Sequence, residues 1–113
     1  MPHNIQDIAQ KILVQHNNQP GESRVHITVH DSILPRTDIQ LHQQHGKLSV
    51  VVSTSSPLSH NIMSGHIEGL QSFLSEQTDH EVTVRLDYQS QDSEQEESQQ
   101  RAYAEAYRQE QNE

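Results

Sequence analysis

Histidine is the residue type in this 113-residue sequence with the most evident chemical potential, because nine histidines occur and no cysteine does. Imidazole is a common metal ligand. His26 and His30 fall on one face of an expected strand, and His42 could lie across the sheet from them. Strand residues four apart are separated by about 13 Å, too far to share one ion. The sequence has no HExxH pattern. The histidines therefore favour a solvated sheet face, and we predict no metal and no cofactor.

Serine is the second group with chemical potential, clustered at Ser53, Ser55 and Ser56 near His60. A serine nucleophile needs a positioned base, and the G-x-S-x-G turn that presents the nucleophile in many hydrolases is missing. Ser56 before Pro57 is instead typical of a helix start, with serine as the cap. We therefore predict no catalytic residues and no enzyme activity.

The composition limits what can position these side chains. Only 30% of the residues are hydrophobic and 4% aromatic, so the core is expected to be small. The formal net charge of −9 repels phosphate backbones and argues against nucleic acid as a partner. No apolar run reaches the roughly 18 residues of a membrane-spanning helix, so no membrane insertion is expected.

Residues 1–21 predict a short helix and a linker. Ile5, Ile8 and Ile12 recur at helical spacing, and Pro20 ends the segment. A helix this short is marginal alone, so we expect it to be optional to the fold.

The middle of the chain changes to a period of two, which predicts strands. Residues 25–29 form one such strand, residues 38–54 a hairpin with its turn near His45 and Gly46, and residues 81–87 a last strand. The residues expected to point into the core are Val25, Ile27, Val29, Ile39, Leu41, Leu48, Val50, Val52, Val82, Val84 and Leu86.

One long helix is predicted over residues 57–76, with an apolar stripe from Leu58 to Leu70 and Leu74. The predicted fold class is α+β, with a small, mostly antiparallel sheet of three to four strands packed on this helix. The strands and helix follow one another in the order ββ-β-α-β, within a globular domain of residues 22–88.

Residues 89–113 form a segment rich in glutamine and glutamate. Residues 90–113 contain seven acidic and two basic residues, a net charge of −5. Such a segment cannot bury enough apolar surface to offset the entropy of ordering, which predicts a disordered tail.

The candidate binding surface is the loop before the hairpin, with the adjoining strand edge, because loops on rigid scaffolds commonly carry recognition. Its residues are Leu34, Pro35, Arg36, Thr37 and Asp38. Arg36 is the best single contact, being a cation in a short exposed loop of an acidic protein. The alternative is that Pro35 and Arg36 only stiffen and solubilise the loop.

Positions over residues 24–88 also follow the pattern of a known family. They are Leu34 and Pro35, Ile39, Leu41, Gly46, Leu48, Val50, Val52, Leu70, Leu74 and the strand from Val82 through Val84 to Leu86. With them the sequence resembles the C-terminal substrate-specificity-switch domain of type III secretion needle-length regulators, the YscP and PscP group. The flagellar hook-length protein FliK is a more distant relation, since Thr37 and Asp38 stand near the place of its leucine-glycine pair.

The resemblance implies a non-enzymatic regulator of type III protein secretion, associated with virulence and forming part of a molecular ruler for needle length. It would bind the cytoplasmic domain of the export-gate switch protein of the YscU/FlhB family and switch export from needle subunits to later substrates. It would act as a monomer in the bacterial cytoplasm, then be secreted through the type III apparatus, and the sequence would be the C-terminal part of a longer chain. The alternative is a dimerising or chaperone-like assembly module that uses the helix of residues 4–16.

Overall fold

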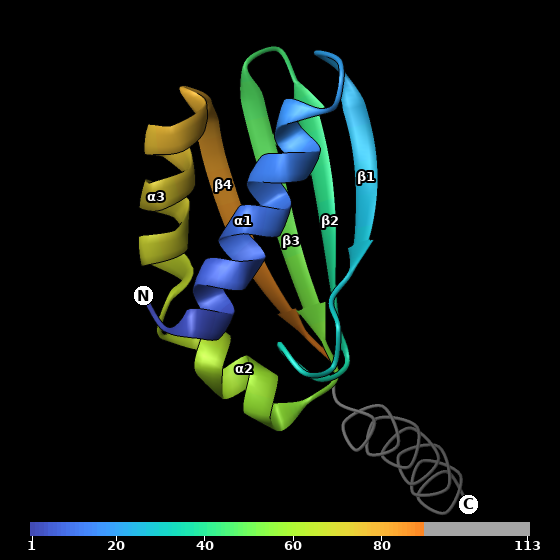
Figure 1. The fold of residues 1–113 in the computed structure, drawn as a ribbon, viewed down its shortest axis with the longest axis vertical. Coiled ribbons are helices and arrows are strands. Elements are labelled where there is room, and N and C mark those ends of the chain that lie inside the picture. The colour runs from blue at the N-terminus through green and yellow to red at the C-terminus, as the bar shows by residue number, and fades with distance from the viewer. Residues whose placement is uncertain (90–113) are drawn as a thin grey trace, which may run out of the picture.

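The computed structural model describes residues 1–89, over which the chain forms three helices and four strands (Figure 1). The helices are α1 (His3–Asn17), α2 (Pro57–Ser64) and α3 (Ile67–Thr78), and the strands are β1 (Ser23–Thr28), β2 (Thr37–Gln44), β3 (Lys47–Thr54) and β4 (Glu81–Tyr88). The α+β class is confirmed. The predicted disordered tail lies outside the described residues, apart from Gln89.

The strands form a single mixed sheet in the order β1-β2-β3-β4. β1 pairs with β2 and β2 with β3 in antiparallel fashion, as predicted, whereas β3 and β4 are parallel. β3 and β4 are parallel because the helical connection between them returns the chain to the end of the sheet where β3 begins. The prediction of a mostly antiparallel sheet is therefore correct for two of the three pairings.

The predicted single long helix is wrong, because α2 and α3 are separate helices in different directions (Figure 1). Gly65 ends α2, and His66 precedes α3 with φ −128° and ψ 8°, outside helical geometry. Glycine stabilises a helix poorly. Met63 and Leu70 are both fully buried, so the break lets each helix direct its own apolar side toward the core.

The predicted short, optional N-terminal helix is also wrong, since α1 spans 15 residues and crosses the face of the sheet (Figure 1). Ile5, Ile8, Ala9 and Ile12 are buried in the same cluster as the strand residues. Packing against the sheet supplies the stability that the isolated segment lacks. The boundary at residue 21 stays a prediction, but α1 is part of one core with the sheet.

The buried face of the sheet agrees closely with the predicted strand pattern. The family-pattern residues on the strands and on α3 are all 6% exposed or less: Ile39, Leu41, Leu48, Val50, Val52, Leu70, Leu74 and Val84. The hairpin turn is also confirmed, because His45 and Gly46 both have positive φ, at 51° and 76°. Two consecutive positive φ angles are the geometry that joins twisted antiparallel strands through two residues.

Candidate functional site

The predicted binding loop lies at the end of the sheet where β1, β3 and β4 finish and α2 begins (Figure 1). We call this region the loop end, and it comprises residues 31–38, 53–60 and 86–89. Two segments distant in the sequence, 53–60 and 86–89, therefore lie beside the loop, and the site cannot be described from the loop alone.

The structure gives the five predicted contact residues different surroundings. Leu34 is fully buried and Thr37 is 3% exposed, so both belong to the core. Pro35 and Asp38 are partly exposed, and Arg36 is exposed. The loop therefore exposes Arg36, while Leu34 and Thr37 anchor it in the interior.

A buried hydroxyl network fixes the loop on the sheet. The Pro35 carbonyl accepts a hydrogen bond of 2.8 Å from the Ser59 hydroxyl, and the Thr37 hydroxyl lies 2.9 Å from the same carbonyl. The Thr54 hydroxyl lies 3.1 Å from that of Thr37 and accepts a bond from the Ser56 amide. Because polar groups without partners are costly to bury, this network disfavours other arrangements of the loop.

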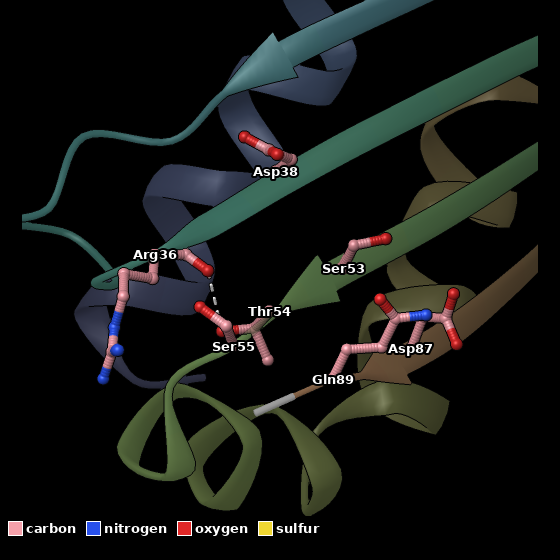
Figure 2. Close-up of a pocket in the computed structure, with 7 residues that line it drawn as sticks. All are labelled: Arg36, Asp38, Ser53, Thr54, Ser55, Asp87 and Gln89. Atoms are coloured by element: carbon pink, nitrogen blue, oxygen red, sulfur yellow. Dashed lines mark hydrogen bonds between the residues drawn. The ribbon is translucent and has the colours of Figure 1, made fainter. Parts of the chain in front are cut away.

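The backbone of Arg36 is held on both sides of its Cα atom. Its amide donates to Asp31 Oδ1 at 3.1 Å. Its carbonyl, on the side of Thr54 and Ser55 (Figure 2), accepts from the Ser55 amide and the Thr54 hydroxyl, each at 3.1 Å. Its φ of 51° lies in the left-handed region, which is unfavourable for arginine. The hydrogen bonds thus maintain a strained backbone that directs the guanidinium away from the sheet.

An open depression of about 390 Å³ lies beside Arg36. Its lining residues are Arg36, Asp38, Ser53, Thr54, Ser55, Asp87 and Gln89 (Figure 2). The strand register places Ser53 between Asp38 and Asp87. One cation beside two carboxylates suits a polar protein surface that carries both signs of charge, and it is unfavourable for a phosphate.

Two exposed apolar side chains also lie at the loop end, and sequence reasoning missed both. Leu58 was assigned to the core stripe, but it lies in the first turn of α2 and is 60% exposed. Tyr88 is 37% exposed, and its ring stacks on His60 with centroids 4.3 Å apart. Tyrosine and arginine are enriched among the residues that dominate binding energy at interfaces. The helix-start signal at Pro57 was the clue that Leu58 precedes the packed part of the stripe.

The histidines and serines singled out first are spread over the sheet and its loops. His26 Nε2 lies 3.7 Å from Asp38 Oδ2 on the open face, whereas His42 pairs with Arg24. His30 lies beyond β1 and contacts Ser32. Within residues 1–89, no three histidine, aspartate or glutamate side chains are grouped closely enough to hold a metal ion.

The predicted cap of α2 is confirmed. Ser56 precedes Pro57, the first residue of the helix, and its hydroxyl accepts a hydrogen bond of 3.2 Å from the Ser59 amide. The serine therefore performs the structural role expected of a helix cap.

Comparison with known proteins identifies the family. The sequence profile described as type III secretion protein (HpaP) matches residues 3–89. The chain belongs to the HpaP family of type III secretion proteins. The match begins at the first residue of α1, in agreement with the place of that helix in the core.

The fold is similar to the crystal structure of the PscP SS domain, with a TM-score of 0.63 and 16% sequence identity. The similarity covers 79% of this chain and 98% of the PscP chain. At this identity it shows a shared fold, and with the HpaP match it confirms the predicted resemblance. A search of curated proteins found no match. No helix within residues 1–89 has the length and apolar character needed to cross a membrane.

Proposed function

We propose that this HpaP-family protein is a non-enzymatic regulator that switches type III export from needle subunits to later substrates. It does so by binding the cytoplasmic domain of the export-gate switch protein of the YscU/FlhB family. It acts in the bacterial cytoplasm, as part of a ruler for needle length, before it is itself exported. The family match and the fold shared with the PscP SS domain support this role.

The observation that carries the proposal is the fixed backbone of Arg36. Three groups of the loop end hydrogen-bond to that backbone while the side chain stays exposed. A loop whose backbone is already fixed loses less conformational entropy on binding than a mobile loop does. Leu58 and Tyr88 add exposed apolar area at the loop end, so the partner should offer a carboxylate to Arg36 and an apolar contact to these two residues.

Titration calorimetry with the export-gate cytoplasmic domain tests the proposal on the full chain. Arg36→Glu should weaken binding at least tenfold, because it reverses the central charge. Lys47→Glu makes the same charge change on an exposed residue at the opposite end of the sheet and should leave the affinity unchanged. Equal affinities for wild type and Arg36→Glu, or failure of the wild type to bind, would overturn the proposal.

The alternative of a dimerising module built on residues 4–16 finds no support in the packing. Ile5, Ile8 and Ile12, which would form such an interface, are fully buried in the protein's own core. We therefore keep a monomer as the prediction, which light scattering of the full chain would check.

A further inference from the structure

The two edge strands of the sheet differ in whether another part of the protein bonds to their outward-facing backbone groups. On β4 the Val84 amide donates to Gln71 Oε1 of α3 at 3.0 Å, so a side chain of the protein already occupies that edge. β1 is the opposite edge, and no described element lies beyond it in the sheet (Figure 1). An uncovered edge can pair with another strand.

The outward-facing groups of β1 can be identified from its pairing. The Val29 amide donates to the Thr37 carbonyl at 3.0 Å, just beyond the end of β1, so the odd-numbered residues of this segment direct their backbone groups to β2. Because this direction alternates along an antiparallel strand, Arg24, His26 and Thr28 direct theirs outward. Three amides and three carbonyls, one of each from every second residue of β1, therefore face outward.

A hollow of about 330 Å³ adjoins this edge on the helix-covered side. Its lining residues are Gln10, Lys11, Val14, Gln15 and Ile27, contributed by α1 and β1. Val14 is 54% exposed, although it is a large hydrophobic residue. A strand added beside β1 would direct every second side chain to this side of the sheet, where an apolar residue would cover Val14 and Ile27.

The charges around the edge differ from those of the whole chain. Lys11 lines the hollow on the helix-covered side, and Arg24 lines another on the open face whose lining contains no carboxylate, in a protein whose formal net charge is −9. Asp38 lies 3.7 Å from His26, and Glu22 directly precedes β1 in the chain. Pairing between two copies through these outward groups would place His26 opposite its own copy and bring two Arg24 side chains to one sheet. The charges therefore favour an acidic strand over a second copy.

We infer that the β1 edge and its hollow form a strand-addition site for an extended segment of another protein in which apolar and acidic residues alternate. The segment's backbone pairs with Arg24, His26 and Thr28, and its apolar residues enter the hollow beside Val14. Its acidic residues lie on the open face with Arg24. Main-chain bonds supply affinity in this mode, and the alternate side chains supply specificity. The site adjoins the loop end at Asp38, but the inference does not depend on the function proposed there.

A synthetic peptide of nine alternating valines and glutamates, blocked at both ends, is a suitable probe. Hydrogen exchange by NMR on the full chain should show slower exchange of the Arg24, His26 and Thr28 amides when the peptide is added. Val25 and Ile27, already bonded to β2, should change little. The same peptide with lysine for glutamate should bind at least tenfold more weakly. No binding, protection elsewhere, or equal binding of the lysine peptide would overturn the inference.

A pair of substitutions at His26 separates backbone pairing from side-chain effects. His26→Pro removes an outward amide and no bond to β2, so the sheet should stay folded while peptide affinity falls at least tenfold. His26→Ala removes the same imidazole but keeps the amide, and it should retain most of the affinity. Equal affinities of the two variants would contradict strand addition. A concentration-dependent dimer that His26→Pro abolishes would show instead that the occupant is a second copy.

Discussion

At one end of the sheet the chain passes from β2 to β3 through His45 and Gly46, and at the other it passes from β1 to β2 through residues 29–36. The short connection is exposed and depends on two positive φ angles. We call its end of the sheet, which comprises residues 44–47 and the paired Glu81, the turn end. The long connection buries Leu34 completely and engages the hydroxyls of Thr37, Thr54 and Ser59.

The comparison shows that the loop end has more buried contacts and hydrogen bonds than the connection of two strands requires. A strained residue persists only where its surroundings determine its conformation, and such residues cluster at binding sites. His45 has the same φ of 51°, but there the two-residue turn accounts for it, whereas the backbone of Arg36 is also held by three hydrogen bonds from other parts of the loop end. We therefore regard the turn end as a connection and the loop end as a site.

The largest expected effect is loss of the buried anchor of the loop. Leu34→Ala should lower the free energy of unfolding by about 2–5 kcal/mol, because it leaves a cavity at a fully buried position. His45→Ala at the turn end removes an exposed side chain and should change that free energy by less than about 1 kcal/mol. Urea unfolding measures both. Similar losses for the two variants would remove the distinction between the ends.

The next effect concerns the hydroxyl network. Thr54→Val keeps the shape but removes the partner of the Ser56 amide and one of the two donors to the Arg36 carbonyl, so it should lower the free energy of unfolding by about 1–3 kcal/mol. Thr83→Val is the matched control on the exposed face of β4 and should be close to neutral, since valine suits a strand. Denaturant unfolding of the two variants checks this. A neutral Thr54→Val would mean that the network does not hold the loop.

Removing a glycine at the turn end and introducing one at the loop end should change the stability of the protein in opposite directions. Gly46→Ala introduces a side chain at φ 76° and should destabilise the protein by about 1–2 kcal/mol. Arg36→Gly relieves the unfavourable φ and should stabilise it by up to about 1 kcal/mol, while weakening binding to the export-gate domain. Thermal unfolding and calorimetry supply the two readings. A large destabilisation by Arg36→Gly would show that the arginine serves stability.

The smallest effect is expected at the surface ion pair of the turn end. Lys47 Nζ lies 4.0 Å from Glu81 Oε2, and both side chains are about three-quarters exposed, at 73% and 74%. Solvent screens such a pair, so Lys47→Ala should change the free energy of unfolding by about 0–0.5 kcal/mol. A loss above about 1 kcal/mol, measured by urea unfolding, would mean that the turn end is more structured than we describe.

Much of the fold follows from local sequence, and the remainder depends on contacts between distant residues. The alternation around Ile39 and Val50 sets the buried face, His45 and Gly46 set the turn, and Ser56 caps α2. These signals act over a few residues. The break at Gly65 cannot be predicted from local sequence, because glycine can remain in a helix when packing compensates for it.

The site is less predictable than the fold for the same reason. The loop itself was predicted from the sequence, but burial of Leu34 and Thr37 depends on β3 and α2 packing around them. Leu58 belongs to a periodic stripe that extends past the covered part of the core, so periodicity alone assigns it inward, and the predicted last strand ends at residue 87, before Tyr88. Their exposure emerges only when α2 and β4 are placed together.

The most direct test of the central claim maps the partner on the protein by NMR. The isotope-labelled full chain would be titrated with the export-gate cytoplasmic domain while its backbone amide shifts are followed. We predict that the shifts concentrate at the loop end, around Arg36, Leu58 and Tyr88, and leave the turn end around Gly46 unchanged. Shifts centred on the turn end, with the loop end unaffected, would contradict the account.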